Sequence, residues 1–253
     1  MNALTRAELL KLRSTRVLPW LLLATLAMVA VTVAFSVPSA TATNNPLSLD
    51  EPTLLARLVG VSFGVPQVTM SLLGALAFTQ EVRYGTITSS FLVEPRRSRV
   101  LVAKGVSLLL VGVVVASATL VVSSIVGIAV IRAKDGNVTV GAHFWQVAAA
   151  SFVVLALYGV IGLAVGTLLR NQIVAVSAVL VWQLLAEHLL IDALPEVERW
   201  TPWGATSGLL QLGSSGISSG TLLAAPIGGL LLVGYAAAAV AYALVIAPRR
   251  DVL

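Results

Sequence analysis

Long, uninterrupted runs of apolar residues dominate the pattern along the chain. Six of them are long enough for a helix to cross a hydrocarbon core about 30 Å thick. They cover residues 17–37, 58–79, 105–131, 144–169, 171–191 and 221–247. Unpaired backbone groups are costly in lipid, so each run is predicted to be helical. The pattern predicts an all-α membrane protein with six transmembrane helices, folded as a single transmembrane domain over residues 1–253.

The distribution of basic residues predicts the orientation of these helices. With the N-terminus in the cytoplasm, 12 of the 16 Lys and Arg residues fall on the cytoplasmic side and four fall outside. Short cytoplasmic loops carry such an excess. An even number of crossings places the C-terminus in the cytoplasm as well. The run at 17–37 exceeds the 7–15 residues of a signal-peptide core, so we interpret it as a transmembrane helix.

Composition supports a membrane protein and excludes several other classes. Hydrophobic residues make up 58% of the chain and charged residues only 11%, against about 25% charged residues in soluble domains. The net charge of +5 does not indicate nucleic-acid binding, because the basic residues form no stripe with interleaved aromatics. The chain has no cysteine, which rules out disulfides and thiolate metal sites. We expect a multi-pass protein of the cell membrane in contact with lipid.

The loop between the second and third runs, residues 80–99, has the most informative pattern. Ile87 and Phe91 fall at helical spacing among polar residues, which predicts a short amphipathic helix. Pro95 disfavours helical geometry at the residue before it and is expected to end this helix. The arginines that follow suit lipid phosphates or an acidic partner surface. A simple positive-inside anchor would also explain these arginines.

The order of residues in this loop resembles that of the type-2 ABC permeases, the membrane subunits of drug, antibiotic and polysaccharide exporters. Glu81, Gly85-Thr86 and Pro95 are followed by Arg96, Arg99 and then Lys104 at the start of the next run. The resemblance extends to six runs, cytoplasmic termini, a cationic N-terminal segment and a broken external segment before the last run.

The resemblance implies that the loop is a coupling helix between transmembrane helices 2 and 3, which docks on a separate ATPase subunit. The residues expected to couple the two subunits are Glu81, Arg83, Gly85, Thr86, Pro95, Arg96 and Arg99. The Glu81 carboxylate is expected to pair with a base of the partner, with Arg83 or with Arg16. The cationic segment 3–16 would be an interfacial connecting helix, and a simple anchor is the alternative.

The chain lacks the phosphate loop of an ATPase and the HExxH motif of a zinc protease. No G-x-x-x-x-G-K-[ST] phosphate loop occurs, so ATP and Mg²⁺ are expected only on the partner ATPase. HExxH is missing, and two histidines are too few for an imidazole metal site. We therefore expect a non-catalytic permease with no cofactor or metal of its own.

By the same resemblance, the translocation path lies between this chain and a second copy or a similar permease chain. The second and fifth runs would line it, with Phe63, Gln67, Met70, Trp182 and Gln183 as candidates. A largely apolar path suits an amphipathic drug, lipid or peptide, and the sequence does not identify which.

Two alternatives are a non-transporting scaffold or assembly protein and an ATP-independent carrier. A proton-coupled carrier normally holds an acid near the membrane midplane, and the centres of the runs contain none. Glu187 and His188 near the end of the fifth run either mark the outer membrane boundary or line the outer end of a path. Residues 192–220 are expected to form interfacial or re-entrant structure.

Overall fold

The computed structural model describes residues 2–14, 17–42, 51–94, 96–212 and 222–246. Every regular element in these ranges is a helix. The elements are α1 (Asn2–Ser14), α2 (Val17–Ala42), α3 (Leu54–Ser62), α4 (Gly64–Arg83), α5 (Thr86–Val93), α6 (Arg97–Ala133), α7 (Ala142–Leu169), α8 (Gln172–Val181), the π-helix η1 (Trp182–Ala186), α9 (Glu187–Ala193), α10 (Pro195–Glu198), α11 (Pro202–Leu209) and α12 (Ala225–Ile246).

Among the residues that the structure describes, five helices are long and apolar enough to cross a membrane. They cover Leu18–Ser36, Leu54–Arg83, Arg97–Ala133, Ala142–Leu169 and Ala225–Val245. The fifth predicted run instead gives a shorter apolar helix, Gln172–Ala186, which continues into α9. The prediction of an all-helical protein is confirmed for the described residues, and the five long apolar helices match five of the six predicted runs.

The connection between α7 and α8 is as short as the sequence predicts. Arg170 adopts a left-handed conformation with φ of 52°, which ends α7. The side chain of Asn171 then caps α8, accepting hydrogen bonds from the backbone N–H groups of Ile173 and Val174 at 3.0 and 3.2 Å. A left-handed residue followed by an Asn cap turns the chain within two residues.

Helices α4 and α7 pack together along their length and form the centre of the bundle. A Cβ at Gly74 or Gly162 would collide with the backbone of the facing helix, and a Cβ at Gly166 would lie 2.6 Å from the carbonyl oxygen of Ala75. Such close approach is typical of small-residue interfaces between membrane helices. The spacing Gly162-x-x-x-Gly166 thus serves packing inside the bundle, whereas Gly234 in α12 faces open space.

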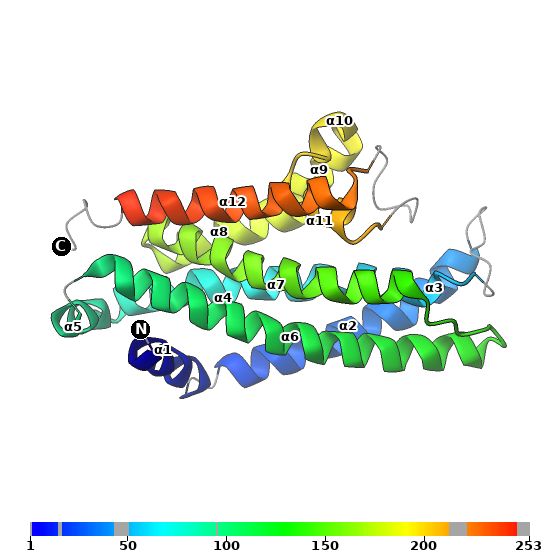
Figure 1. Ribbon diagram of the computed structural model, residues 1–253, viewed down its shortest axis with the longest axis horizontal. Coiled ribbons are helices and arrows are strands. Elements are labelled where there is room, and N and C mark those ends of the chain that lie inside the picture. The colour runs from blue at the N-terminus through cyan, green and yellow to red at the C-terminus, as the bar shows by residue number, and fades with distance from the viewer. Residues whose placement is uncertain (1, 15–16, 43–50, 95, 213–221, 247–253) are drawn as a thin grey trace.

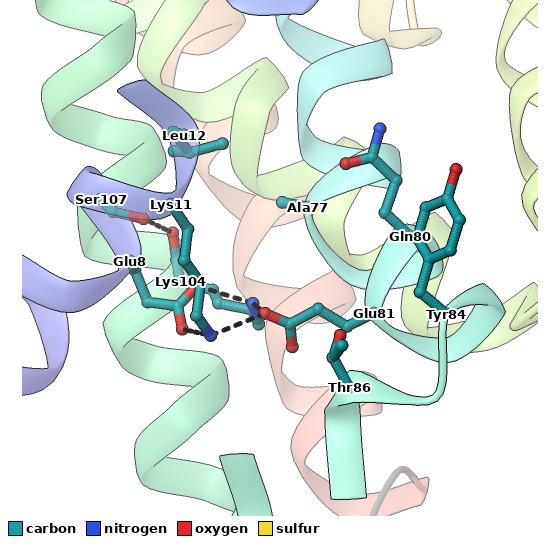
Figure 2. A pocket seen from close by; sticks show the side chains of 10 residues that line it. All are labelled: Glu8, Lys11, Leu12, Ala77, Gln80, Glu81, Tyr84, Thr86, Lys104 and Ser107. Carbon is teal, nitrogen blue, oxygen red and sulfur yellow. Dashed lines mark hydrogen bonds and ion pairs between the residues drawn. The ribbon is translucent and has the colours of Figure 1, made fainter. Parts of the chain in front are cut away.

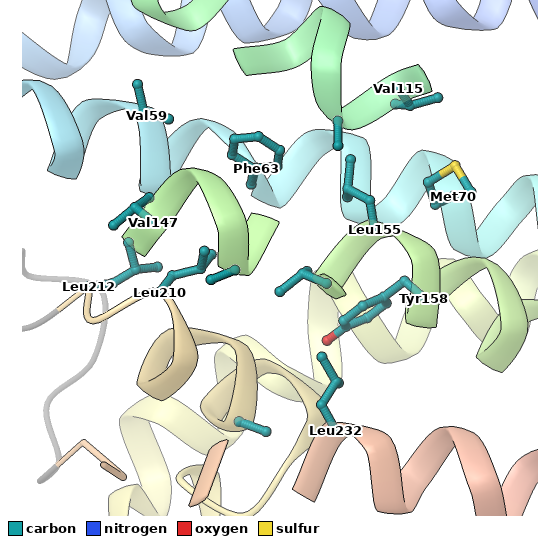
Figure 3. Packing of buried hydrophobic residues seen from close by; sticks show 14 of the residues in the cluster. Val59, Phe63, Met70, Val115, Val147, Leu155, Tyr158, Leu210, Leu212 and Leu232 are labelled. Carbon is teal, nitrogen blue, oxygen red and sulfur yellow. The ribbon is translucent and has the colours of Figure 1, made fainter. Parts of the chain in front are cut away.

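The largest buried side chains gather around this α4–α7 seam. Figure 3 shows Phe63, Met70, Leu155 and Tyr158 packed between α4, α7 and α11. In Figure 1, α6 and α12 lie on opposite sides of α7, while α1, α5 and the last turn of α12 lie together at one end of the bundle. The opposite end carries α3 and the α6–α7 loop. The helix of the predicted coupling loop, α5, therefore lies at the same end of the bundle as α1.

Candidate functional site

A short helix, α5, stands at one end of the bundle between the two long helices α4 and α6 (Figure 1). Gly85 connects α4 to α5 with a φ of 69°, a conformation that is unfavourable for residues with a Cβ. Ile87 is 2% exposed and anchors α5 to the core, while Leu92 is 79% exposed. The amphipathic helix predicted for this loop is therefore present, with one side held by the bundle and another side open.

Four charged side chains meet directly beneath α5 and tie three helices together (Figure 2). Lys104 of α6 contacts Glu8 of α1 at 2.7 Å and Glu81 of α4 at 2.8 Å. Lys11 of α1 contacts the same two carboxylates at 2.9 and 2.8 Å. We call Glu8, Lys11, Glu81 and Lys104 the charge cluster. Because its members come from three helices, it fixes α1 to the ends of α4 and α6 from which α5 is suspended.

Within the chain, Glu81 pairs with Lys11 and Lys104, and pairing with a base of a partner subunit stays a prediction. Arg83 does not pair with Glu81 but donates a hydrogen bond to the Gln172 side chain at 3.2 Å, and Arg16 lies outside the described residues. The reason is helical geometry: Glu81 and Arg83 are two residues apart on α4 and point in different directions. The signal that would have found the true partners is Lys104, a cation set inside an apolar run, with Glu8 and Lys11 at i,i+3 spacing on α1.

Burial and charge act in opposite directions on the two members of the cluster that α1 contributes. Burial favours the neutral form of Glu8, but Lys104 and Lys11 outweigh it and hold the pKa of this carboxyl below its ordinary 4.5. Burial likewise disfavours the charged form of Lys11, but Glu81 and Glu8 outweigh it and raise the pKa of this amine above its ordinary 10.5. Both side chains are therefore charged at neutral pH.

These shifts predict a window of pH in which α1 stays docked. The stabilisation from Glu8 is fully present above pH 4.5 and is lost as the pH falls through its lowered folded pKa. The stabilisation from Lys11 is fully present below pH 10.5 and is lost as the pH rises through its raised folded pKa. Thermal unfolding of the purified protein, followed by circular dichroism, should therefore vary little between about pH 5 and 9 and weaken below about 4.5.

The matched control for this pH dependence is Glu8→Gln, which removes one titrating group from the cluster. Its unfolding midpoint should fall less steeply than that of the wild type as the solution is acidified. An identical acid limb in the variant and the wild type would show that the cluster does not govern this transition.

A pocket of about 430 Å³ lies beside the charge cluster. Its lining comprises Glu8, Lys11, Leu12, Ala77, Gln80, Glu81, Tyr84, Thr86, Lys104 and Ser107. The second carboxylate oxygen of Glu81, Oε2, is buried and has no hydrogen-bond partner. This oxygen retains the capacity to accept a hydrogen bond from a donor that enters the pocket.

The remaining residues of the predicted coupling loop surround α5. Thr86 begins α5, is exposed and lines the pocket. Arg96 and Arg99 are exposed after α5, and Arg99 pairs with Glu94 at 3.5 Å. Pro95 lies outside the described residues, and the helix before it ends at Val93. The structure thus places the described members of this set around one end of the bundle.

The five predicted path residues divide into two groups. Phe63, Gln67 and Met70 are fully buried in the core. Trp182 is 45% exposed, and Gln183 is buried, donating a hydrogen bond to the Ser71 hydroxyl at 2.7 Å. They do not share one open surface within a single copy of the chain, so their role in a path stays a prediction.

Glu187 is buried within the chain. It is 1% exposed and accepts a hydrogen bond from Trp182 Nε1 at 2.9 Å, at the junction of η1 and α9. π-Turns inside helices are frequent at functional sites. Burial within the chain does not decide whether Glu187 marks the outer membrane boundary or lines the outer end of a path, so both stay predictions, and the side chain of His188 lies outside the described set.

The segment after α9, which is predicted to be external, contains two short helices in its described part. Helix α10 is followed by α11, whose residues Gly204–Gly208 are buried and which packs against α12. Thr201 caps α11 by accepting a hydrogen bond from the Gly204 N–H at 3.2 Å. With eight residues, α11 is too short to cross a bilayer. Residues 213–221 lie outside the described part of the chain.

Compared with protein-family models and with curated proteins, this sequence gives no match. The class of the protein therefore follows from its own structure. Five apolar helices of spanning length, assembled around an α4–α7 core, indicate an α-helical multi-pass membrane protein.

Proposed function

We propose that this chain is the permease subunit of an ATP-driven ABC-type exporter, with ATP hydrolysed on a separate subunit. The observation that carries the proposal is α5, a short helix suspended between two long helices with an exposed outer surface. Such a helix is suited to receive a partner that must move both transmembrane helices at once. The resemblance of residues 81–104 to type-2 ABC permeases supports the same conclusion.

The charge cluster supports a role for α5 as a rigid lever. Glu81 lies in the last turn of α4 and Lys104 lies in the second turn of α6, so their contact at 2.8 Å joins the helices on both sides of α5. Lys104 is only 2% exposed, and separating it from Glu8 and Glu81 would leave buried charges uncompensated. Force applied to α5 would thus be transmitted to α1, α4 and α6 together.

A sixth crossing by α8, η1 and α9 completes the proposed topology. These elements follow one another without a break from residue 172 to 193, or about 33 Å of helix, which matches a hydrocarbon core of about 30 Å. An even number of crossings agrees with the position of α1 and the end of α12 at one end of the bundle (Figure 1). The excess of Lys and Arg assigns this end to the cytoplasm.

The proposed path lies between this chain and a second copy or a similar permease chain in the cell membrane. The fifth segment presents an apolar surface that the bundle leaves open, with Ile173, Val181 and Leu185 each more than half exposed. A partner permease covering this face would place Trp182 at the interface. Amphipathic drugs, lipids or peptides remain the class of cargo that such a surface suits.

One observation favours a second candidate, an ATP-independent carrier. The sequence argued against a carrier because the runs lacked a central acid, yet Glu187 is buried and bound to Trp182. Buried acids of this kind serve as proton sites in carriers. Transport driven by a pH gradient through the purified chain alone, without ATP, would support the carrier and overturn the permease.

Purification in mild detergent tests the proposal. We expect the chain to bring down a protein that contains G-x-x-x-x-G-K-[ST] and hydrolyses ATP, identified by mass spectrometry. The recovered complex should show ATP hydrolysis that depends on the Glu81–Arg99 loop. A stable preparation free of any nucleotide-binding protein would favour a scaffold.

A further inference from the structure

A second cavity lies on the membrane-facing surface. Its lining is apolar apart from Thr167, whereas charged residues line the pocket beside the charge cluster. The second cavity is a groove of about 190 Å³ between α6, α7 and α12. Its lining is Leu101, Val102, Gly105, Val106, Leu109, Val160, Leu163, Ala164, Thr167, Val240, Ala243 and Leu244. The lining residues come from α6, α7 and α12, and α6 and α12 lie on opposite sides of α7 (Figure 1).

Gly105 opens this groove from the α6 side. A Cβ built at Gly105 meets no atom within 4 Å, although the residue lies in the middle of a row of groove-lining side chains. The absence of a side chain leaves room beside Leu101 and Leu109. In a bilayer such a gap either costs van der Waals contacts or is filled by a hydrocarbon chain.

Two arginines lie near the end of the groove that is closest to α5. Arg97 begins α6 four residues before Leu101, so it continues the row of residues 101, 105 and 109 on the same helix face. Arg170 follows α7 three residues after Thr167 at the same end of the bundle. Arg97 therefore lies about one helical turn, or about 6 Å, beyond the apolar lining of α6, and Arg170 lies in the turn that ends α7.

We infer that this groove is a binding site for one anionic phospholipid, with an acyl chain between α6, α7 and α12 and the phosphate at Arg97 and Arg170. Lipid chains are as apolar as the groove, so the hydrophobic effect does not retain the lipid there. Retention comes from packing in the space at Gly105 and from attraction between the phosphate and the arginines. The site does not depend on the proposed transport function.

Native mass spectrometry of the delipidated protein, titrated with dioleoyl phosphatidylglycerol, tests this inference. The wild type should retain one lipid, and Gly105→Phe should weaken this binding at least fivefold, because the new ring fills the groove. Gly234→Phe is the matched control: Gly234 also lies in a membrane helix with no atom within 4 Å of a built Cβ, but it does not line the groove. Its lipid binding should equal that of the wild type.

Two further variants keep the test decisive. Val102→Phe blocks the groove from a position that is already partly exposed, and it should repeat the loss if Gly105→Phe fails to fold. Arg97→Gln should reduce the preference for phosphatidylglycerol over phosphatidylcholine at least threefold. The acyl chain should still bind in the groove of this variant. Unchanged lipid binding in both groove variants would overturn the inference, as would a change in oligomeric mass in place of a change in bound lipid.

Discussion

Replacing Lys104 with Met is expected to destabilise the protein by about 3–5 kcal/mol, the cost of leaving a buried ion pair without one of its partners. The ammonium of Lys104 is 2% exposed and lies 2.7 Å from Glu8 and 2.8 Å from Glu81. Without it, two carboxylates face one another with only the half-exposed Lys11 between them. The free energy of unfolding in detergent, measured by denaturant titration, gives the effect.

Two comparisons separate lost charge balance from lost packing. Lys11→Met should cost no more than about 1 kcal/mol, because this amine is partly solvated and exposed ion pairs contribute little. The triple variant Glu8→Gln, Glu81→Gln, Lys104→Met should recover most of the loss, since neutral groups replace the buried charges together. If the triple variant were as unstable as Lys104→Met, the destabilisation would have a cause other than uncompensated charge.

Leu92→Glu is expected to reduce transport more than tenfold while leaving the fold intact. Leu92 is 79% exposed on α5, so the protein itself makes little use of its side chain. An apolar residue at the centre of a docking surface contributes strongly to binding, and a buried carboxylate there would be unpaired. Transport by cells and ATPase activity of the purified complex measure the loss, and the unfolding temperature reports on the fold.

The matched control for this variant lies at the other end of the bundle. Val140 is an exposed apolar residue in the loop between α6 and α7. Val140→Glu should leave transport and ATPase association unchanged. Equal transport by Leu92→Glu and the wild type would remove α5 from the coupling mechanism.

Those parts of the fold that depend on local pattern followed directly from the sequence. The hydrophobic runs predicted the long helices, the Arg170-Asn171 turn followed from the absence of a linker, and Ile87 predicted the buried side of α5. Each of these features is decided by residues that are neighbours in the chain. The lengths of the observed helices differ from those of the predicted runs because helices such as α6 extend beyond the apolar run on both sides.

Those parts of the site that depend on tertiary contacts did not follow from the sequence. Glu81 and Glu8 are 73 residues apart, and only the packing of α1 against α6 brings Lys104 between them. The burial of Glu187 likewise depends on how η1 and α9 sit against the bundle. A charge near the end of an apolar run has the same sequence signature whether it faces water or the interior.

Site-directed cross-linking from α5 tests the central claim, that α5 docks on an ATPase, most directly. The chain has no cysteine, so Leu92→Cys carries one thiol at the exposed surface, and Val140→Cys carries one at the opposite end. After labelling with a thiol-reactive photo-cross-linker in native membranes, the Leu92→Cys adduct should contain a protein with a G-x-x-x-x-G-K-[ST] motif, absent from the Val140→Cys sample. Adducts from Leu92→Cys that contain no nucleotide-binding protein would contradict the account.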